Sequence, residues 1–301
     1  MGKNAIRTSR GEEAFYFVNG LLVAAFCILV LLPLLNVVAL SLNDGKDAAR
    51  GGIVFWPRVW SIDNFREIFE NGELVNAYTV TIFRTVVGIF LGVLFNALAA
   101  YALKFKSLPG RGIITFIIFF TMLFGGGLIP YFILLKNLHL YNTIWVYVIP
   151  GIYSAWNILL LRTYMESLGS SLEESAKLDG AGDVVVFFKI IVPLSMPILA
   201  VIALYIGVGQ WNDWFSGIYF VSEQKLQPMA TVLQRMLDTQ ELLRKYIARQ
   251  GSFFENKQQR MVTAASLKSA TVIVTAGPII FFYPFLQKYF VKGIMIGAIK
   301  G

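Results

Sequence analysis

Six long apolar runs divide the chain, and stretches richer in charged residues separate them. A bilayer core about 30 Å thick needs about 20 mostly apolar helical residues to cross it. The pattern therefore predicts an all-α membrane protein, with residues 1–301 forming a single transmembrane domain. Six transmembrane helices are expected at about residues 21–42, 79–103, 112–135, 143–161, 198–220 and 264–286.

The start of the chain is basic, but no convincing small-residue cleavage site follows the first apolar run. A secretory signal would carry one. The first run is therefore expected to be a retained helix. Proline and glycine interrupt several runs, and the sequence does not separate packing kinks from gating hinges at Pro33, Gly125–Gly127, Pro150 and Pro278.

Composition supports the membrane assignment. Hydrophobic residues make up 56% of the chain and charged residues 15%, against about 45–50% and about 25% in soluble domains. The net charge of +8 is explained by basic loops facing the cytoplasm, so a lipid bilayer is expected as partner and no nucleic acid. The single cysteine, Cys27, and the single histidine, His139, exclude an intrachain disulfide and a Cys/His metal site.

The distribution of basic residues gives a modest indication of orientation. Lys and Arg outside the spans divide 12 to 12 between the two sides, or 12 to 5 when the long loop 222–263 is discounted. The discount is reasonable because charges close to the span ends dominate topology. Both termini are therefore expected in the cytoplasm.

The loop between the fourth and fifth spans has a distinctive local pattern. Ser171 followed by Glu174 is a capping box, which predicts the start of a helix, and Gly180 is expected to end it. Asp183 is expected to cap a second, apolar helix over residues 184–192. The loop is either a projection that transmits motion from a soluble partner or an ordinary amphipathic segment at the headgroups.

Residues 166–197 resemble the EAA loop of ABC importer permeases. Alanine is more usual in that family where this chain has Ser175. Residues 55–65, 211–213 and 287–301 are similar to the sugar permeases related to the smaller maltose-type subunit. Residues 126–145 and the loop 222–263 further resemble the branch for complex oligosaccharides, including alginate-type transporters. The motif positions are Glu174, Ser175, Ala176, Asp179, Gly180, Ala181, Pro193, Leu194 and Pro197.

The resemblance implies a type I ABC importer permease in the bacterial cytoplasmic (inner) membrane. Its partners would be a homologous second permease forming a heterodimer, two ATPase subunits and an extracytoplasmic solute-binding protein. Glu174 to Ala181 would form the coupling helix on the ATPase. The chain has no G-x-x-x-x-G-K-[ST] phosphate loop, so ATP and Mg are expected on the ATPase partners, and no enzyme activity or cofactor is expected here.

Polar residues inside the spans are candidates for contact with a sugar, because such groups are costly in a membrane. Arg84 is a candidate for an acidic saccharide, although snorkelling or an ion pair with Glu73 is the preferred interpretation. Asn157 is a weaker candidate, since a buried amide often only joins helices. The predicted pathway residues are Gln210, Asn212, Trp214, Asn157 and Arg84.

The loop 222–263 is expected to contain a helix from Met229 to Arg249 and carries 7 basic against 4 acidic residues. Docking of the binding protein is preferred over a merely solvated helix. An ion-gradient-driven secondary transporter is the alternative function, but it requires acidic residues at mid-membrane, and Asp213 is the sole doubtful case. A membrane enzyme has no nucleophile–base or metal pattern to support it.

Overall fold

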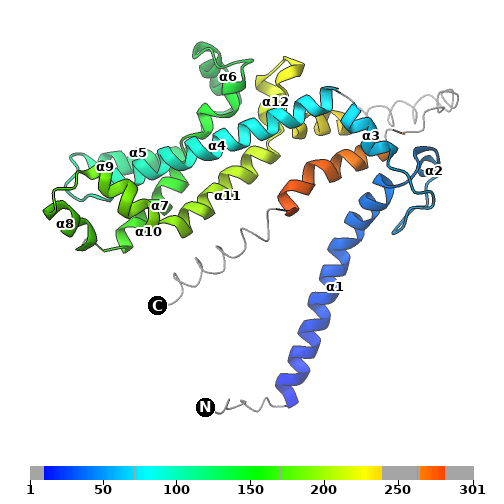
Figure 1. The fold of residues 1–301 in the computed structure, drawn as a ribbon, viewed down its shortest axis with the longest axis horizontal. Coiled ribbons are helices and arrows are strands. Elements are labelled where there is room, and N and C mark those ends of the chain that lie inside the picture. The colour runs from blue at the N-terminus through cyan, green and yellow to red at the C-terminus, as the bar shows by residue number, and fades with distance from the viewer. Residues whose placement is uncertain (1–9, 71, 170, 239–262, 264, 282–301) are drawn as a thin grey trace. The chain divides into compact units, whose positions relative to one another are not determined.

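A computed structural model describes residues 10–70, 72–169, 171–238, 263 and 265–281 (Figure 1). Most of these residues are helical, and the only extended pairing among them is an isolated bridge between Asn43 and Trp60. The described residues fall into two compact units, residues 10–70 with 263 and 265–274, and residues 72–169 and 171–238 with 275–281. The single domain expected over the whole chain stays a prediction.

The first unit begins with α1 (Arg10–Ser41), a helix of 32 residues. It starts about three turns earlier than the apolar run indicated, and it continues through Pro33. The most apolar stretch of α1 is fully exposed in the isolated chain. A helix that is apolar and unburied in this way is suited to lipid or to a neighbouring membrane subunit.

Two short helices follow, α2 (Gly45–Ala49) and α3 (Asp63–Glu70). Asp44 is the N-cap of α2, and its carboxylate accepts hydrogen bonds from the backbone amides of Lys46 and Asp47. This satisfies two of the amides that a helix start leaves unpaired.

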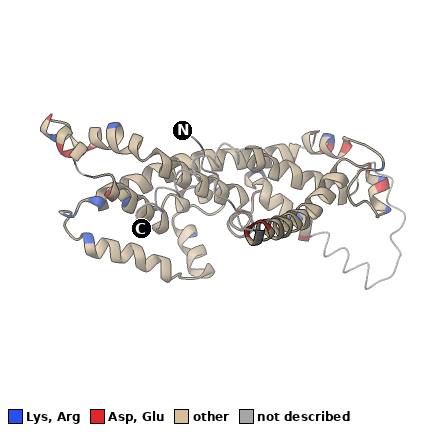
Figure 2. Cartoon of the chain, turned by 90° about the horizontal axis from the view of Figure 1, so that it is seen from below, with Lys and Arg blue, Asp and Glu red and all other residues tan. Residues whose placement is uncertain are grey.

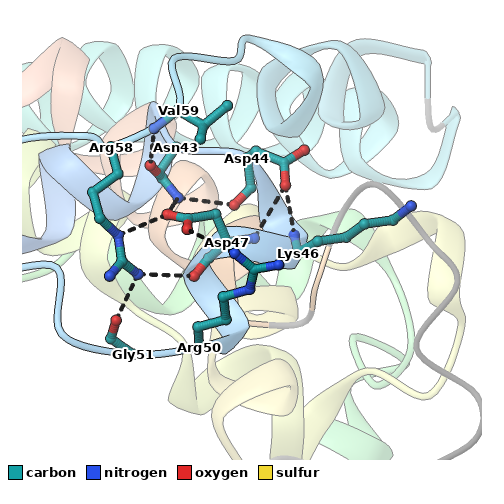
Figure 3. A network of polar contacts seen from close by, with 8 residues as sticks. All are labelled: Asn43, Asp44, Lys46, Asp47, Arg50, Gly51, Arg58 and Val59. Carbon is teal, nitrogen blue, oxygen red and sulfur yellow. Dashed lines mark hydrogen bonds and ion pairs between the residues drawn. The ribbon is translucent and has the colours of Figure 1, made fainter.

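A network of polar side chains holds the loop around α2 (Figure 3). Asn43 Nδ2 donates to Asp47 Oδ2 at 3.0 Å, and Arg58 Nε donates to the same oxygen at 3.0 Å. The hydrogen bond from Asn43, together with the Arg58 guanidinium, holds the pKa of Asp47 below its ordinary value against the opposing effect of burial. Asn43 Oδ1 also accepts from the Val59 amide at 2.9 Å. The loop therefore has a defined shape.

The second unit is built on α4 (Gly72–Lys104), a helix of 33 residues. It packs against α7 (Ala155–Ser167) and α11 (Met196–Asn212), which run beside it in Figure 1.

Glycines allow α4 and α11 to approach closely. A Cβ on Gly92 would lie 2.8 Å from Ile206 Cδ1, and one on Gly207 would lie 2.9 Å from Ile89 Cδ1. Each helix therefore receives an isoleucine of the other against a glycine, the kind of small-residue packing that holds helices together in membranes.

Three of the predicted spans are interrupted. The run 112–135 forms α5 (Arg111–Leu123) and α6 (Leu128–Asn137), separated by the glycines before Leu128. The run 143–161 begins with the 3-10 turns η1 (Ile144–Tyr147) and η2 (Ile149–Gly151) and bends by 41° into α7. The run 198–220 breaks at Asp213 and resumes as α12 (Phe215–Phe220).

The number of spans is therefore less simple than the apolar runs suggested. Among the described residues, two helices are long and apolar enough to cross a membrane, or up to 4 if each bent pair is one span. The helix Ala265–Phe281 covers most of the predicted sixth span, and residues 282–286 lie outside the described residues. Charged residues gather near the helix ends and in the turns, with long uncharged stretches between them (Figure 2).

The loop before α11 contains α8 (Ser171–Leu178), α9 (Asp183–Val186), the π-helix η3 (Phe187–Ile191) and α10 (Val192–Leu194). The expected helix 184–192 is thus divided, and Asp183 does not cap it, because the N-cap is Gly182. The Asp183 carboxylate instead accepts the Lys177 ammonium at 2.8 Å. Residues 183–194 meet α11 at an 82° bend.

After α12 the chain forms η4 (Gln224–Leu226) and a helix over residues 229–238. This is the first half of the helix expected from Met229 to Arg249, and the second half lies outside the described residues. Thr231 Oγ1 donates to the Trp214 carbonyl at 3.0 Å, so this helix is tied to the break between α11 and α12.

Candidate coupling loop and transport pathway

The end of α8 is a Schellman motif at Gly180, the residue that the sequence predicted would end the helix. Gly180 has φ +83°, a conformation that glycine adopts without steric cost. Its amide donates to the Lys177 carbonyl at 3.0 Å, and the Ala181 amide donates to the Ala176 carbonyl at 2.9 Å. These two bonds satisfy the last carbonyls of the helix, so the turn that ends α8 has a fixed geometry.

Small side chains hold α8 against the rest of the second unit. Ala176 and Ala181 pack against a core cluster that includes Tyr101, Met165 and Phe187. The alanines allow the helix backbone to lie close to these larger side chains. A bulky residue at either position would overpack the contact.

The opposite face of α8 is open. Leu178 is 89% exposed and Leu172 is 53% exposed, and the motif residues Glu174, Ser175 and Asp179 are exposed as well. These two leucines lie among exposed polar residues of the motif and not against the core of the second unit. Of the residues that the EAA resemblance assigned to coupling, the exposed face therefore carries Glu174, Ser175 and Asp179, whereas Ala176 and Ala181 pack against the core.

Three charged contacts fasten α8 to its surroundings. Glu173 is 5% exposed and forms an ion pair with Lys104 at the end of α4. Lys177 pairs with Asp183, and its ammonium lies 5.0 Å from the centre of the Phe105 ring. Sequence reasoning missed Glu173, because the EAA motif contains only its neighbour Glu174. The partner of Glu173, Lys104, lies 69 residues away in the chain, so local sequence does not reveal the pair.

A second polar cluster lies within the spans, at the break between α11 and α12. Arg84 of α4 is 1% exposed. It donates to Asp213 Oδ2 at 2.6 Å, to the Asp213 carbonyl at 3.0 Å and to Gln210 Oε1 at 3.0 Å. Its guanidinium carbon lies 4.3 Å from the centre of the Tyr147 ring. One cation thus joins α4, η1 and the α11–α12 break.

The Gln210 side chain belongs to the same cluster, and backbone of neighbouring elements lies close around it. Its Nε2 donates to the Tyr147 carbonyl at 2.9 Å. A Cβ at Gly88 or at Gly151 would lie 3.0 Å from the Gln210 side chain, so glycines of α4 and η2 form the walls around the amide. Asp213 Oδ1 also accepts from the amide of Ser216, in the first turn of α12, at 3.1 Å.

The predicted pathway residues therefore separate into two groups. Arg84, Gln210 and Asn157 are buried, and the ion pair of Arg84 is with Asp213, in place of the snorkelling or the Glu73 pair that the sequence favoured. Asn212 and Trp214 are exposed, with Trp214 at 40%. Their assignment to the pathway stays a prediction, and in this conformation they are the accessible members of the set.

Sequence reasoning also missed Asn96, which is 1% exposed in α4. Its Nδ2 donates to the carbonyls of Gly92 at 2.6 Å and Ile152 at 2.7 Å, and its Oδ1 accepts from the Ser154 amide at 3.0 Å. The Asn96 side chain thus pairs with backbone groups of residues 152 and 154, which lie just before α7. Such groups need a partner inside a membrane. An amide in the middle of an apolar run was the available signal.

Acidic, histidine and cysteine side chains do not converge on a metal position anywhere in the described ranges: no group of three or more was found.

Comparisons with known proteins agree with one another. The chain is 32% identical to the polygalacturonan/rhamnogalacturonan transport system permease protein YtcP of Bacillus subtilis, over 92% of this chain and 94% of that protein. It is 30% identical to the protein LplC of the same organism, over 99% of both chains.

A solved structure is similar in fold as well as in sequence. The crystal structure of a bacterial ABC transporter involved in the import of the acidic polysaccharide alginate matches with a TM-score of 0.84 and 28% identity. The match covers 94% of this chain and 99% of that one. The family model described as "Binding-protein-dependent transport system inner membrane component" matches residues 71–296. The chain therefore belongs to this family and is a permease subunit with the type I ABC importer fold.

Proposed function

We propose that this chain forms half of the transmembrane pathway of an ATP-driven importer for an oligosaccharide that carries carboxylate groups. Its partners are a homologous second permease, two ATPase subunits that bind ATP and Mg, and an extracytoplasmic solute-binding protein. Both termini lie in the cytoplasm. Membership of a binding-protein-dependent family replaces the ion-gradient-driven carrier that the sequence left as an alternative.

The observation that carries the proposal is the exposed face of α8. Leu178 is nearly fully exposed at the end of a helix whose other face is packed and whose terminal turn is fixed. Apolar area left in water is unfavourable by about 25 cal/mol for each Å², so a partner that covers this face gains free energy. A groove of an ATPase subunit would receive the helix, with Glu174 at its exposed edge.

Support for an acidic saccharide comes from the relatives. The similar crystal structure belongs to an importer of the acidic polysaccharide alginate, and YtcP is described as transporting polygalacturonan and rhamnogalacturonan. Arg84 does not hold the substrate carboxylates in this conformation, because its side chain is buried and paired with Asp213. Asn212 and Trp214 are the accessible groups, an amide for hydroxyls and an aromatic face for a sugar ring.

The test is ATP hydrolysis by the reconstituted complex of both permeases, the ATPase subunits and the binding protein. A panel of neutral and uronate oligosaccharides of matched length is added, and stimulation by the uronate members is expected. Stimulation by neutral sugars alone would refute the acidic substrate, and a complex in which no saccharide stimulates hydrolysis would refute the importer assignment.

Two variants at Gly180 then test the coupling helix. Gly180→Ala and Gly180→Trp both carry the strain of a positive φ, and no atom lies within 4 Å of the added Cβ. They differ in the bulk offered to the ATPase. Stimulated hydrolysis is expected to survive mostly in Gly180→Ala and to be lost in Gly180→Trp. Equal activity of the two variants in assembled complexes would contradict the docking of this turn on the ATPase.

A further inference from the structure

The place where α8 meets the spanning helices is an ion pair with little access to solvent. Glu173 lies in the first turn of α8 and its side chain is 7% exposed. Lys104 is the last residue of α4, and its side chain is 10% exposed. The ammonium donates directly to Glu173 Oε1.

A buried pair resists separation more strongly than an exposed one. Removing one member leaves a charge that water does not reach, which is strongly unfavourable. The other ion pair of α8 in the described chain, Lys177 with Asp183, has side chains that are 44% and 67% exposed. Exposed pairs of that kind contribute little. The Lys104–Glu173 pair is therefore the stiffer of the two ionic contacts of α8.

The helix that carries Lys104, α4, runs from this ion pair through the membrane-spanning part of the second unit. Lys104 and Arg84 are 20 residues apart on one uninterrupted helix, which corresponds to about 30 Å along its axis. At the Arg84 level α4 is tied to Asp213 and Gln210 at the α11–α12 break. A displacement of α8 thus has a continuous path through α4 to Asn212 and Trp214.

We propose that Lys104 and Glu173 are positioning residues that couple α8 to α4, so that the two helices move as one body during the ATP cycle. The inference rests on the proposed function, because it takes α8 as the element that the ATPase moves. It assigns a role to a residue beside the EAA motif whose contact is inside the permease and not with the ATPase.

The contact is tested by the ratio of saccharide transported to ATP hydrolysed in proteoliposomes. Lys104→Met and Glu173→Gln are expected to lower this ratio by about fivefold or more, the lower end of measured coupling between sites, while the complex still assembles and hydrolyses ATP. The exchanged pair, Lys104→Glu with Glu173→Lys, is expected to recover at least half of the wild-type ratio.

Arg111→Met is the matched control. Arg111 lies at the same end of the bundle and pairs with Glu166 of α7, so the variant removes an ion pair that does not involve α8. Its ratio is expected to equal that of the wild type. A wild-type ratio in both Lys104→Met and Glu173→Gln would overturn the proposal. So would a proportional fall of hydrolysis and transport, or an equal loss of the ratio in Arg111→Met.

A second measurement does not depend on the folding of these variants. Spin labels at Ser171→Cys at the start of α8, away from the face assigned to the ATPase, and at Lys106→Cys beyond α4, in a Cys27→Ser background, report the distance between the two elements in the otherwise native complex. The distance is expected to stay constant between the ATP-free and ATP-bound states, and a change of several Å would overturn the proposal.

If the wild-type complex shows no saccharide-stimulated hydrolysis, the proposed function fails. If it does, and the ratio or distance result is contrary, this inference alone fails.

Discussion

Removing the Arg84 side chain from the α11–α12 break should be among the more destabilising single changes in the second unit. Arg84→Met keeps most of the apolar stem but deletes a cation that donates three hydrogen bonds, two of them to Asp213. The Asp213 carboxylate then remains among apolar helices without its ionic partner, although it keeps the Ser216 amide.

The magnitude follows from burial. Deleting one member of a buried ion pair costs about 3–5 kcal/mol. Arg84 is 1% exposed, but the Asp213 side chain is 26% exposed, so water compensates part of the lost interaction. We therefore expect about 3 kcal/mol for Arg84→Met, the lower end of that range. Asp213→Asn keeps an oxygen acceptor but leaves the buried Arg84 cation without its anion, so it should cost a comparable amount, about 2–3 kcal/mol.

The assay is a double-mutant cycle on the free energy of unfolding, measured by titration of the detergent-solubilised protein with SDS and circular dichroism. In the double variant Asp213→Asn has removed the carboxylate that would otherwise be buried without an ionic partner. The double variant should therefore be more stable than Arg84→Met alone. The interaction free energy should reach about 1–3 kcal/mol. Arg66→Met is the control, since its pair with Asp63 is exposed and should contribute at most about 1 kcal/mol.

Strict additivity of Arg84→Met and Asp213→Asn would refute this reasoning, because it would mean that the two side chains stabilise the protein independently. A cost for Arg84→Met no larger than that of Arg66→Met would refute it too. Either result would show that the α11–α12 break is held by packing and not by the ion pair.

Two further predictions concern packing and pH. A Cβ at Gly217 would clash with Thr231 Oγ1, so Gly217→Ala should lower the melting temperature through an overpacking cost of about 1–3 kcal/mol. Gly209→Ala, with no atom within 4 Å of its Cβ, should not lower it, and equal melting temperatures of the two variants would contradict the contact. The lowered pKa of Asp47, caused first by the Asn43 hydrogen bond, stabilises its loop fully above the ordinary value of 3.8, and this contribution is lost as the pH falls through the lowered pKa. Hydrogen exchange in that loop, corrected for the intrinsic rate, should therefore rise with acid in the wild type but not in Asp47→Asn, and identical pH profiles would exclude the carboxylate as the cause.

Much of the coupling loop was readable from local sequence. The start of α8 at Ser171 and the turn at Gly180 that follows its last residue, Leu178, depend on side chains and backbone conformations within a few residues. This is the range over which capping and glycine signals act. The split of the next helix into α9, η3 and α10 was not readable. The apolar run there is continuous, and the expected cap, Asp183, forms an ion pair with Lys177 instead.

The sequence by itself determined the membrane class, the family and the two ends of α8, because hydropathy, motif spacing and helix capping are local or additive along the chain. Only the tertiary structure decided which polar residues inside the spans are accessible. Arg84 and Asp213 are 129 residues apart, and Lys104 and Glu173 are 69 apart. In a medium without water a buried charge must find its partner wherever the fold brings one, and periodicity along one helix does not reveal where that partner lies.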